Sequence, residues 1–286
     1  MVTEASGVRA VSRALDVLQA FTPERTSLSI GELVKASGLP RTTVLRLVET
    51  LVAERMLQHV ADGRVAVGTR LIRWGAFAAA AWTVPEATAA RMAELAAETG
   101  ETVSLYVRSG TTRVVVAQSP SPHSLRHVVQ VGDELPLWKG AAGLVLLSSV
   151  APEALGAEVA ALAATVAGSG AGAASGSGAA SGSGSGAASG SGAADGSAAE
   201  VVDEEALVAR VEQARAAGWS LSHGVREPGN SGMAVPVPGR DGAQPVALAL
   251  GGPTSRFGDE ATARFLGALQ AASSDIARTG LPPALD

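Results

Sequence analysis

Residues 29–51 read SIGELVKASGLPRTTVLRLVETL, and this stretch decides the fold of the first part of the chain. Ser29 and Glu32 have the S-x-x-E spacing of a capping box, in which each side chain accepts a hydrogen bond from the other residue's backbone at a helix start. We therefore predict a helix that begins here and runs to about Ser37. Gly38 suits the tight turn that would end this helix, because glycine readily adopts the left-handed conformation found there.

A second helix is expected directly after the turn, from Pro40 to about Glu54, because proline is tolerated in a first helical turn. Its apolar side chains recur at helical spacing and form one face, which consists of Val44, Leu47, Val48 and Leu51. The opposite side carries Arg41, Thr42 and Arg46. Two helices joined by a short glycine turn, the second with an arginine and threonine face, indicate a helix-turn-helix.

The segments on either side of this motif complete a winged helix-turn-helix. Val8–Phe21 has apolar residues at helical spacing and predicts a preceding helix. Leu57–Val60 and Arg64–Val67 are short β-prone runs around an Asp-Gly pair, which is a strong hairpin signal in this position. Three helices followed by a β-hairpin, the wing, match the pattern of this DNA-binding fold.

A helical connector is expected next. Thr69 to about Glu98 has helical patterning, interrupted near Pro85 because proline ends or kinks a helix. We interpret this segment as two helices that link the first part of the chain to the rest. Its large apolar side chains need a partner, namely Trp74, Phe77 and Trp82. Packing on the rest of the chain and a seam between two copies both remain open.

The remainder of the chain alternates strand-like and helical patterns. The predicted strands are 102–108, 113–118, 127–131, 233–238 and 246–250. The predicted helices are 140–150, 153–166, 203–217 and 259–278. Elements mixed in this way favour an α+β domain built around an antiparallel sheet.

A low-complexity tract interrupts this second domain. Every residue from Ala167 to Ala194 is Gly, Ala or Ser, which predicts a flexible linker because such side chains offer no core. We therefore divide the chain into a winged helix-turn-helix at 1–68, a helical connector at 69–98 and a second domain at 99–286, with the linker at 167–194.

Charge and composition limit the kind of protein. Residues 1–75 carry 10 Lys and Arg against 7 Asp and Glu, whereas the rest carries 12 against 20. A basic first part and an acidic remainder are expected if only the first part meets a polyanion. No apolar stretch is long enough to span a bilayer, and the first ten residues lack the order of a secretion signal. We expect a cytoplasmic protein.

The chain lacks the patterns of common catalytic and metal sites. It contains neither G-x-S-x-G nor H-E-x-x-H, and its glycine-rich tract lacks the G-K-[ST] ending of a phosphate loop. It has no cysteine, and its 4 histidines do not have a metal-binding spacing. We therefore expect a protein that is not an enzyme and that uses no metal or cofactor.

A series of motifs closely resembles the IclR-type transcriptional regulators. The first half has the capped helix, GLPRTTVLRLVETL, the wing and VGTRLIRWG. The second half has VGDELPL, AAG, LL, GW, REPG, AVPV and GP in that order. Each motif is modest alone, but this order is hard to obtain by chance. The resemblance covers nearly the whole chain except the linker.

The resemblance implies a winged helix joined to a GAF-like α/β effector domain, which binds small organic molecules that are commonly carboxylates. It also implies homodimers, often dimers of dimers, on palindromic operators in double-stranded DNA. Arg55 stands where the family usually has a glycine, which predicts a less sharp exit from the second helix of the motif. The effector half also departs from the family's polar positions, which here hold Trp138, Leu144, Ser222 or His223, Ala249 and Gly251. Fewer polar anchors predict a more apolar ligand than a small dicarboxylate, or none.

The candidate DNA contacts lie on the second helix of the motif and on the wing. Arg46 is placed to bond a guanine edge in the major groove, and Thr42 lies one turn away. Arg41 and Thr43 lie near the helix start, where phosphates bind. Arg64 in the wing is a candidate for the DNA backbone or the minor groove. Alternatively, exposed side chains of these types merely solvate the surface.

The candidate effector contacts lie at two places in the second domain. Ala141, Ala142 and Gly143 open a helix whose backbone amides suit an anion, although close packing also demands small residues. Trp138 either walls a pocket or fills the core. Asn230, Ser231 and Gly232 offer donors to a ligand or simply make a turn.

The sequence thus predicts a sequence-specific DNA-binding transcriptional regulator, and more specifically a repressor. Its operator affinity would be modulated by a small organic effector, a carboxylate or a more apolar acid. The alternative is a ligand-sensing or protein-assembly module whose winged helix does not bind DNA. Several phosphate contacts produce a steep salt dependence, which distinguishes the two.

Overall fold

The computed structural model describes residues 8–22, 24–171, 202–239 and 244–285, with the side chains of α7 described as far as Ala167. The chain forms two compact units, Met1–Ala81 and Trp82–Asp286. We describe each unit by itself. Within the described ranges, no helix is long and apolar enough to cross a membrane.

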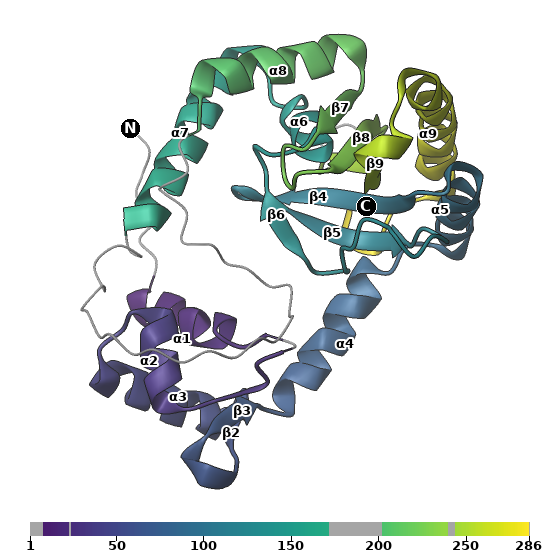
Figure 1. The fold of residues 1–286 in the computed structure, drawn as a ribbon. Helices are drawn as coiled ribbons and strands as arrows, with labels where there is room; N and C mark the ends of the chain where they lie inside the picture. The colour runs from purple at the N-terminus through teal and green to yellow at the C-terminus, as the bar shows by residue number, and fades with distance from the viewer. Residues whose placement is uncertain (1–7, 23, 172–201, 240–243, 286) are drawn as a thin grey trace, which may run out of the picture. The chain divides into compact units, whose positions relative to one another are not determined.

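The first unit has the expected order of three helices and a hairpin (Figure 1). Its helices are α1 (Arg9–Gln19), α2 (Ile30–Ser37), α3 (Arg41–Ala53) and most of α4 (Arg70–Trp82). Its strands β1 (Ser27–Leu28), β2 (Leu57–His59) and β3 (Val65–Val67) form an antiparallel sheet in the order β1-β3-β2. The predicted winged helix-turn-helix is confirmed.

The capping box fixes the start of α2 as predicted. The Ser29 amide donates to Glu32 Oε2 at 2.7 Å, and the Glu32 amide donates to Ser29 Oγ at 3.3 Å. Gly38 ends the helix with φ 64°, the left-handed conformation that glycine adopts without strain. The buried faces of the three helices meet the sheet in one apolar core, made of Val17, Leu28, Leu33, Val44, Val48, Leu51, Leu57 and Val65.

The exit from α3 differs from the prediction. Arg55 itself adopts a left-handed conformation, with φ 58°, so the chain turns as sharply as it would at a glycine. The Met56 amide donates to the Leu51 carbonyl at 2.8 Å, and the Arg55 amide donates to the Val52 carbonyl at 2.9 Å. This pair of bonds is the Schellman arrangement of a helix end. The less sharp exit predicted from Arg55 is wrong, because these bonds hold an arginine in the strained conformation.

The second unit is a six-stranded antiparallel sheet in the order β6-β5-β4-β9-β8-β7. The strands are β4 (Thr102–Ser109), β5 (Thr112–Ser119), β6 (Glu134–Pro136), β7 (Ser220–His223), β8 (Asn230–Val237) and β9 (Val246–Pro253). The helices are α5 (Glu86–Thr99), α6 (Ala141–Leu147), α7 (Pro152–Ala171), α8 (Glu204–Ala217) and α9 (Asp259–Thr279). The α+β class with an antiparallel sheet is confirmed.

Helices cover both faces of this sheet (Figure 1). Alternate residues of β9 show the division, since successive strand side chains point to opposite faces. Val246, Leu248 and Leu250 belong to the core beneath α5 and α9, with Leu95, Phe265 and Leu269. Ala247 and Ala249 belong to the other core, beneath α6, α7 and α8. Small residues on that second face leave room for the cavity described below.

One predicted strand of the second unit is wrong, and two observed strands, β6 and β7, were not predicted. The predicted strand His127–Val131 has no strand structure, because the edge of β5 pairs instead with β6, where Val114 faces Glu134. The three valines of that segment have β propensity, but they precede the turn at Gly132, which has φ 95°. Only the residues after this turn pair with β5, as strand β6.

The first residues of the predicted linker are helical. Helix α7 continues through Ala171, so Ala167–Ala171 is helical rather than linker. The rest of the predicted linker, 172–194, lies outside the described residues.

Candidate functional site

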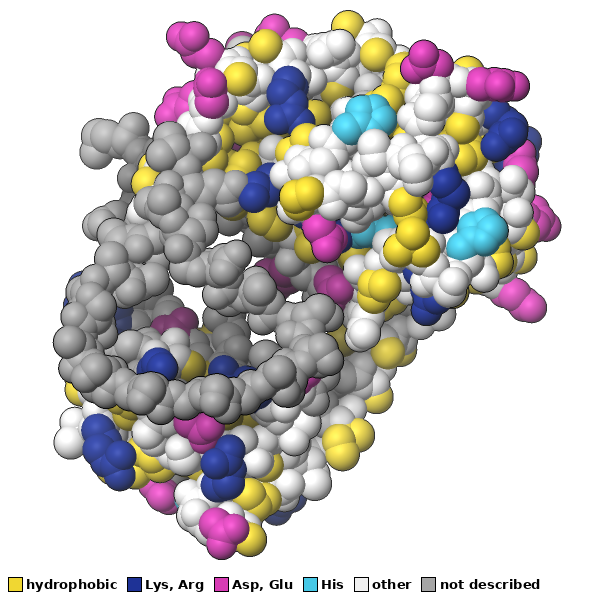
Figure 2. Space-filling view, in the orientation of Figure 1, with side chains coloured by type: hydrophobic (Ala, Val, Ile, Leu, Met, Phe, Trp, Pro, Cys, Tyr) yellow, Lys and Arg dark blue, Asp and Glu magenta, His cyan; other side chains and the backbone are white. Residues whose placement is uncertain are grey.

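Helix α3 presents the polar face that the sequence placed opposite its core. Val44 and Val48 are buried, whereas Arg41, Thr42 and Arg46 are exposed and Thr43 is half-buried. Within the described part of the chain, no hydrogen bond occupies either guanidinium. Lys and Arg side chains are exposed on this unit in Figure 2. The face is therefore cationic and available to an anionic partner.

Arg64, the candidate contact on the wing, already has partners within the first unit. Its Nη2 donates to the Ser27 carbonyl at 2.6 Å, and its Nε donates to Ser27 Oγ at 3.3 Å. The same guanidinium lies 3.2 Å from Glu32 Oε2. Arg64 thus joins the wing to β1 and to the start of α2, which is a structural role that sequence reasoning missed.

A cavity of about 50 Å³ lies in the second unit. Its wall comes from β4, β5, β8, β9, the start of α6, the end of β7 and the segment before β6. Its polar and charged lining is Ser104, Tyr106, Arg113, His127, Ser222, Arg226, Asn230 and Ser231. No aspartate or glutamate is part of this lining, so the cavity favours a negatively charged occupant.

Arg113 is the most deeply buried cation of the cavity, with 4% of its surface exposed. Its Nη1 donates to the carbonyls of Pro136 and Lys139, and its guanidinium stacks over the Tyr106 ring at 5.5 Å. Burial lowers the pKa of Arg113 to about 10, so the side chain keeps its charge at neutral pH. Its Nε has no hydrogen-bond partner. A buried charged donor is thus left without an acceptor beside the cavity.

His127 and Arg226 also line the cavity, and the His127 ring contacts both Arg226 and Asn230. Asn230 Nδ2 lies 2.7 Å from His127 Nδ1, and Arg226 Nη2 lies 3.2 Å from the same atom. Burial, together with the charges of Arg226 and Arg113, lowers the pKa of His127 from 6.5 to about 4. The ring is therefore neutral. Both neighbours are donors, so Nδ1 is the acceptor and Nε2 bears the proton.

Unpartnered polar atoms concentrate at this cavity. Among the residues that the structure describes, the buried side-chain atoms without a hydrogen bond are Ser104 Oγ, Arg113 Nε, Asn230 Oδ1 and Trp138 Nε1. The first three belong to residues that line the cavity. Because a buried polar group without a partner costs free energy, such a concentration indicates a site that a bound molecule completes.

The structure brings some of the predicted effector residues to the cavity and leaves others out. Ala141, Ala142, Asn230, Ser231 and Gly232 line it. The Ala141 amide at the start of α6 already donates to Ser222 Oγ at 3.1 Å.

Trp138 and Gly143 do not line the cavity. Trp138 packs on the core beneath α6. A side chain on Gly143 would come within 1.9 Å of the Leu137 carbonyl oxygen, so close packing explains this glycine.

The charged residues of the cavity were missed by sequence reasoning. Arg113 sits in a β-prone run, where it resembles an exposed strand residue. Arg226 and His127 lie in irregular segments. The only available signal was that Arg113 directly precedes the apolar run VVVA in a strand (TRVVVAQS) that the structure places inside the sheet. The cavity is therefore more polar than the departures from the family pattern predicted.

Comparison with known proteins decides the family. The model of the IclR helix-turn-helix domain matches residues 10–61, and the model of the bacterial transcriptional regulator IclR C-terminal region matches 77–167 and 194–278. The chain belongs to the IclR family of transcriptional regulators. As in this family, it is a sequence-specific DNA-binding regulator of transcription. IclR-family proteins are regulators rather than enzymes.

Individual IclR-family proteins are similar over nearly the whole chain. The HTH-type transcriptional regulator XynR of Escherichia coli is 25% identical over 272 residues, which cover 95% of this chain and 96% of XynR. A solved IclR-family regulator from Rhodococcus sp. is 36% identical with a TM-score of 0.56, covering 100% of this chain and 98% of that one. A second, from Silicibacter sp., has a TM-score of 0.69 at 24% identity over 97% and 99% of the two chains, and it shows the same fold.

Proposed function

We propose that this regulator binds a small organic carboxylate in the cavity of its second unit, and that the bound acid changes its affinity for operator DNA. The observation that carries the proposal is the buried Arg113, whose Nε lacks an acceptor, in a cavity that Arg226 also lines and that holds no acidic side chain. A carboxylate supplies the missing acceptor in a charge-assisted hydrogen bond. The effector is therefore an acid rather than a neutral apolar molecule.

A relative of the same fold supports this class of ligand. An IclR homologue from Microbacterium hydrocarbonoxydans, 20% identical with a TM-score of 0.65, was crystallised in complex with 4-hydroxybenzoate. An aromatic acid would pair its carboxylate with the two arginines and lay its ring beside Tyr106 and Ala249, and the cavity of about 50 Å³ would have to widen to admit the ring. Asn230, Ser231 and Gly232 would contact the polar end of such a ligand, with Ala141 and Ala142 beside it.

On DNA, we propose that α3 enters the major groove. Arg46 and Thr42 would contact bases, and Arg41 and Thr43 would contact phosphates, because these residues lie on the face of α3 turned away from the core. Arg64 is the weakest of the candidate contacts, since reaching DNA would break its bonds to Ser27.

We propose a homodimer, and a dimer of dimers where operators are paired, on a palindromic operator. Two apolar stripes of the first unit support a partner chain. Val8, the residue before α1, is 68% exposed, and Val11 and Leu15 on α1 are 56% and 52% exposed. Ile72, Trp74 and Phe77 on α4 are 73%, 56% and 55% exposed. Trp82 is half-buried against the core of the second unit and is not part of these stripes.

The division at 1–68, 69–98 and 99–286 is retained as a functional proposal, in which the connector carries the effector response to the winged helix. Repression of nearby genes, a cytoplasmic location and the lack of an enzymatic activity belong to the same proposal.

The test is a mobility shift with the DNA upstream of the protein's own gene, against a shuffled duplex, across salt concentrations. Specific retardation that weakens steeply with salt is expected. The shift is then repeated with 4-hydroxybenzoate, benzoate and the methyl ester of 4-hydroxybenzoate. The ester keeps the ring and the carbonyl group but is uncharged and carries one additional methyl group, so release of DNA by an acid and not by the ester supports an anion site.

A pair of variants locates the site. Arg226→Gln removes a cavity cation, and Arg108→Gln is the matched control, because the Arg108 and Arg226 side chains are 24% and 23% exposed and only Arg226 lines the cavity. Losing a charge-assisted bond should weaken acid binding about 10-fold or more. Equal response to acid and ester, or equal loss in both variants, would defeat the proposed anion site.

A further inference from the structure

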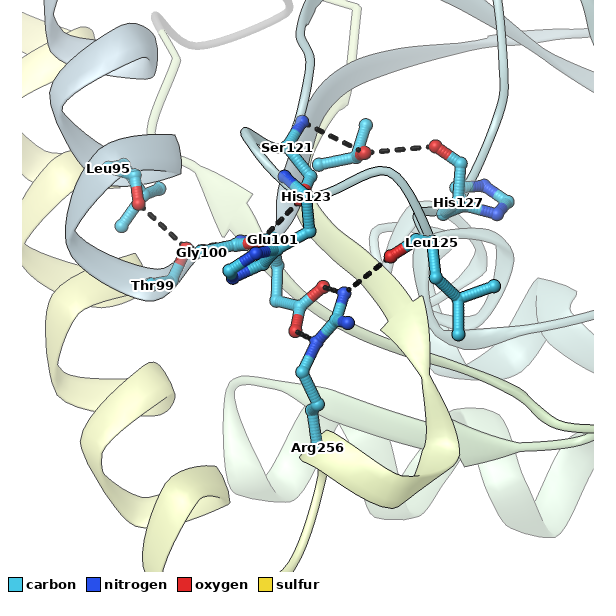
Figure 3. Close-up of polar contacts among 10 residues, drawn as sticks. Leu95, Thr99, Gly100, Glu101, Ser121, His123, Leu125, His127 and Arg256 are labelled. Atoms are coloured by element: carbon cyan, nitrogen blue, oxygen red, sulfur yellow. Dashed lines mark hydrogen bonds and ion pairs between the residues drawn. The ribbon is translucent and has the colours of Figure 1, made fainter.

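One irregular segment, 121–128, contributes His127 to the wall of the cavity. It lies between β5 and β6 without helix or strand, so side-chain bonds must define its path. Figure 3 shows three such anchors. Ser121 Oγ donates to the Gly100 carbonyl at 2.6 Å, Thr102 Oγ1 donates to the His127 carbonyl at 2.9 Å, and Arg256 Nη2 donates to the Leu125 carbonyl at 3.1 Å.

The third anchor depends on a buried carboxylate. Glu101 is fully buried, and its Oε1 and Oε2 accept from Arg256 Nε at 2.5 Å and from Arg256 Nη2 at 2.8 Å (Figure 3). Arg256 comes from the short turn Thr254–Arg256 directly after β9. Two bonds to the carboxylate fix the plane of the guanidinium, which then points a remaining donor at Leu125. The same Nη2 thus joins Glu101 to the segment that carries His127.

Two neighbouring glycines of β9 accommodate both sides of this arrangement. A Cβ on Gly252 would lie 1.9 Å from Glu101 Oε2, and a Cβ on Gly251 would lie 2.7 Å from His127 Cδ2. Consecutive strand residues face opposite sides of the sheet. Glu101 therefore packs directly on the strand backbone on one side, and the His127 ring packs on it on the other.

Stability alone does not explain a buried ion pair in this place. Replacing such a pair by apolar side chains is often neutral or stabilising, because removing two charges from water costs about as much as their attraction returns. A bidentate ion pair does, however, fix the orientation of the guanidinium. Here the fixed orientation directs Arg256 Nη2 at the carbonyl of Leu125, two residues before His127.

We infer that Glu101 and Arg256 are positioning residues for the effector site: the pair holds segment 121–128 in place so that the His127 ring stays against Gly251 in the cavity wall. The inference rests on the proposed function, which identifies the cavity as the effector site. The Glu101–Arg256 pair lies outside the cavity lining and would keep the site formed before any ligand binds.

The experiment uses the full-length protein without ligand. The main variant is the double substitution Glu101→Gln with Arg256→Met, which removes both charges and leaves no unpaired buried carboxylate. The matched control is Arg108→Met with Glu158→Gln, because that pair is also partly buried within the second unit and neither residue lines the cavity. Arg256→Lys is the conservative variant, since a single ammonium can pair with Glu101 without the planar fork that also reaches Leu125.

Two readouts follow the segment itself. Amide hydrogen exchange of the peptide covering 121–130 should accelerate at least 10-fold in the Glu101→Gln, Arg256→Met protein, and by an intermediate factor in Arg256→Lys. The NMR titration of His127, assigned with His127→Gln, should move from about 4 toward the ordinary value of 6.5 as the ring leaves its buried position. The Arg108→Met, Glu158→Gln control shows whether general loosening of the fold moves the same titration.

The outcomes are distinct. Changes in both readouts, absent from the Arg108→Met, Glu158→Gln control, support the inference. Unchanged exchange and an unchanged His127 titration in the folded main variant overturn it, as do equal changes in the control. Failure of the proposed function would appear separately, as wild-type protein that ignores every acid in the mobility shift.

Discussion

Arg55 offers a direct test of how the end of α3 is built. It occupies the position after α3 where a left-handed conformation is needed, with φ 58°, and its side chain is exposed. A left-handed conformation costs an L-residue about 1–2 kcal/mol. Glycine avoids this strain but loses about 0.5–1 kcal/mol more chain entropy on folding. We therefore expect Arg55→Gly to be more stable than Arg55→Ala by about 0.5–1 kcal/mol.

The comparison with alanine isolates the backbone effect, because both variants remove the same charged side chain. Native-state hydrogen exchange of the slowest amides of α3 in the full chain measures the stability of the first unit without interference from the second. The expected difference is a roughly 2- to 5-fold slower exchange in Arg55→Gly than in Arg55→Ala.

Gly38, at the end of α2, offers a control in which the substitution should lower stability instead of raising it. Gly38 has φ 64° and open space where a Cβ would lie, so Gly38→Ala introduces the strain without a clash. It should accelerate exchange by a similar factor. If Gly38→Ala behaves as expected but Arg55→Gly exchanges no more slowly than Arg55→Ala, the conclusion that Arg55 is strained is refuted.

Three further predictions concern the DNA face, the strand β9 and the cavity histidine. Arg46→Ala should cost about 1–3 kcal/mol of operator affinity and relax the preference at one base pair, measured by mobility shifts on a set of single-base operator variants; equal loss on random DNA would identify a phosphate contact instead. Gly252→Ala should destabilise the second unit by about 1–3 kcal/mol in a thermal melt, because its Cβ would overlap the buried Glu101 carboxylate, and an unchanged melting temperature would contradict that packing. Since the pKa of His127 falls from 6.5 in the unfolded chain to about 4 in the folded one, the unfolded state binds the extra proton between these values. The resulting contribution is fully present above pH 6.5 and is lost as pH falls toward 4, so urea melts of the wild type and of His127→Gln should converge over this range.

The winged helix was predictable because each of its signals is local. Ser29 and Glu32 lie three residues apart, the turn at Gly38 needs only its own backbone, and the apolar face of α3 repeats along one helix. The Asp-Gly pair likewise defines the hairpin without reference to distant residues. Such patterns survive folding because the same short segment contains both partners.

The cavity was not predictable for the opposite reason. Arg113, His127 and Arg226 come from separate segments and meet only when the six-stranded sheet has formed. Arg113 is charged yet buried, and its burial depends on carbonyls of Pro136 and Lys139 that follow another strand. A sequence pattern records neither the pairing of β5 with β6 nor the segment that replaces the expected strand at 127–131.

The packing of the connector limits how an effector response could be transmitted from the cavity to the winged helix. Helix α5 belongs to the core of the second unit, with Leu95 fully buried and Arg91 joined to Asp275 of α9 at 3.0 Å. Trp82 and Val84, just before α5, also pack on that core. A bound acid must act through a difference in its affinity for two arrangements of the protein. Because the connector is held from Trp82 onward, we expect these arrangements to differ in how the second unit holds α5 and the Trp82 anchor, with α4 carrying the change to the winged helix.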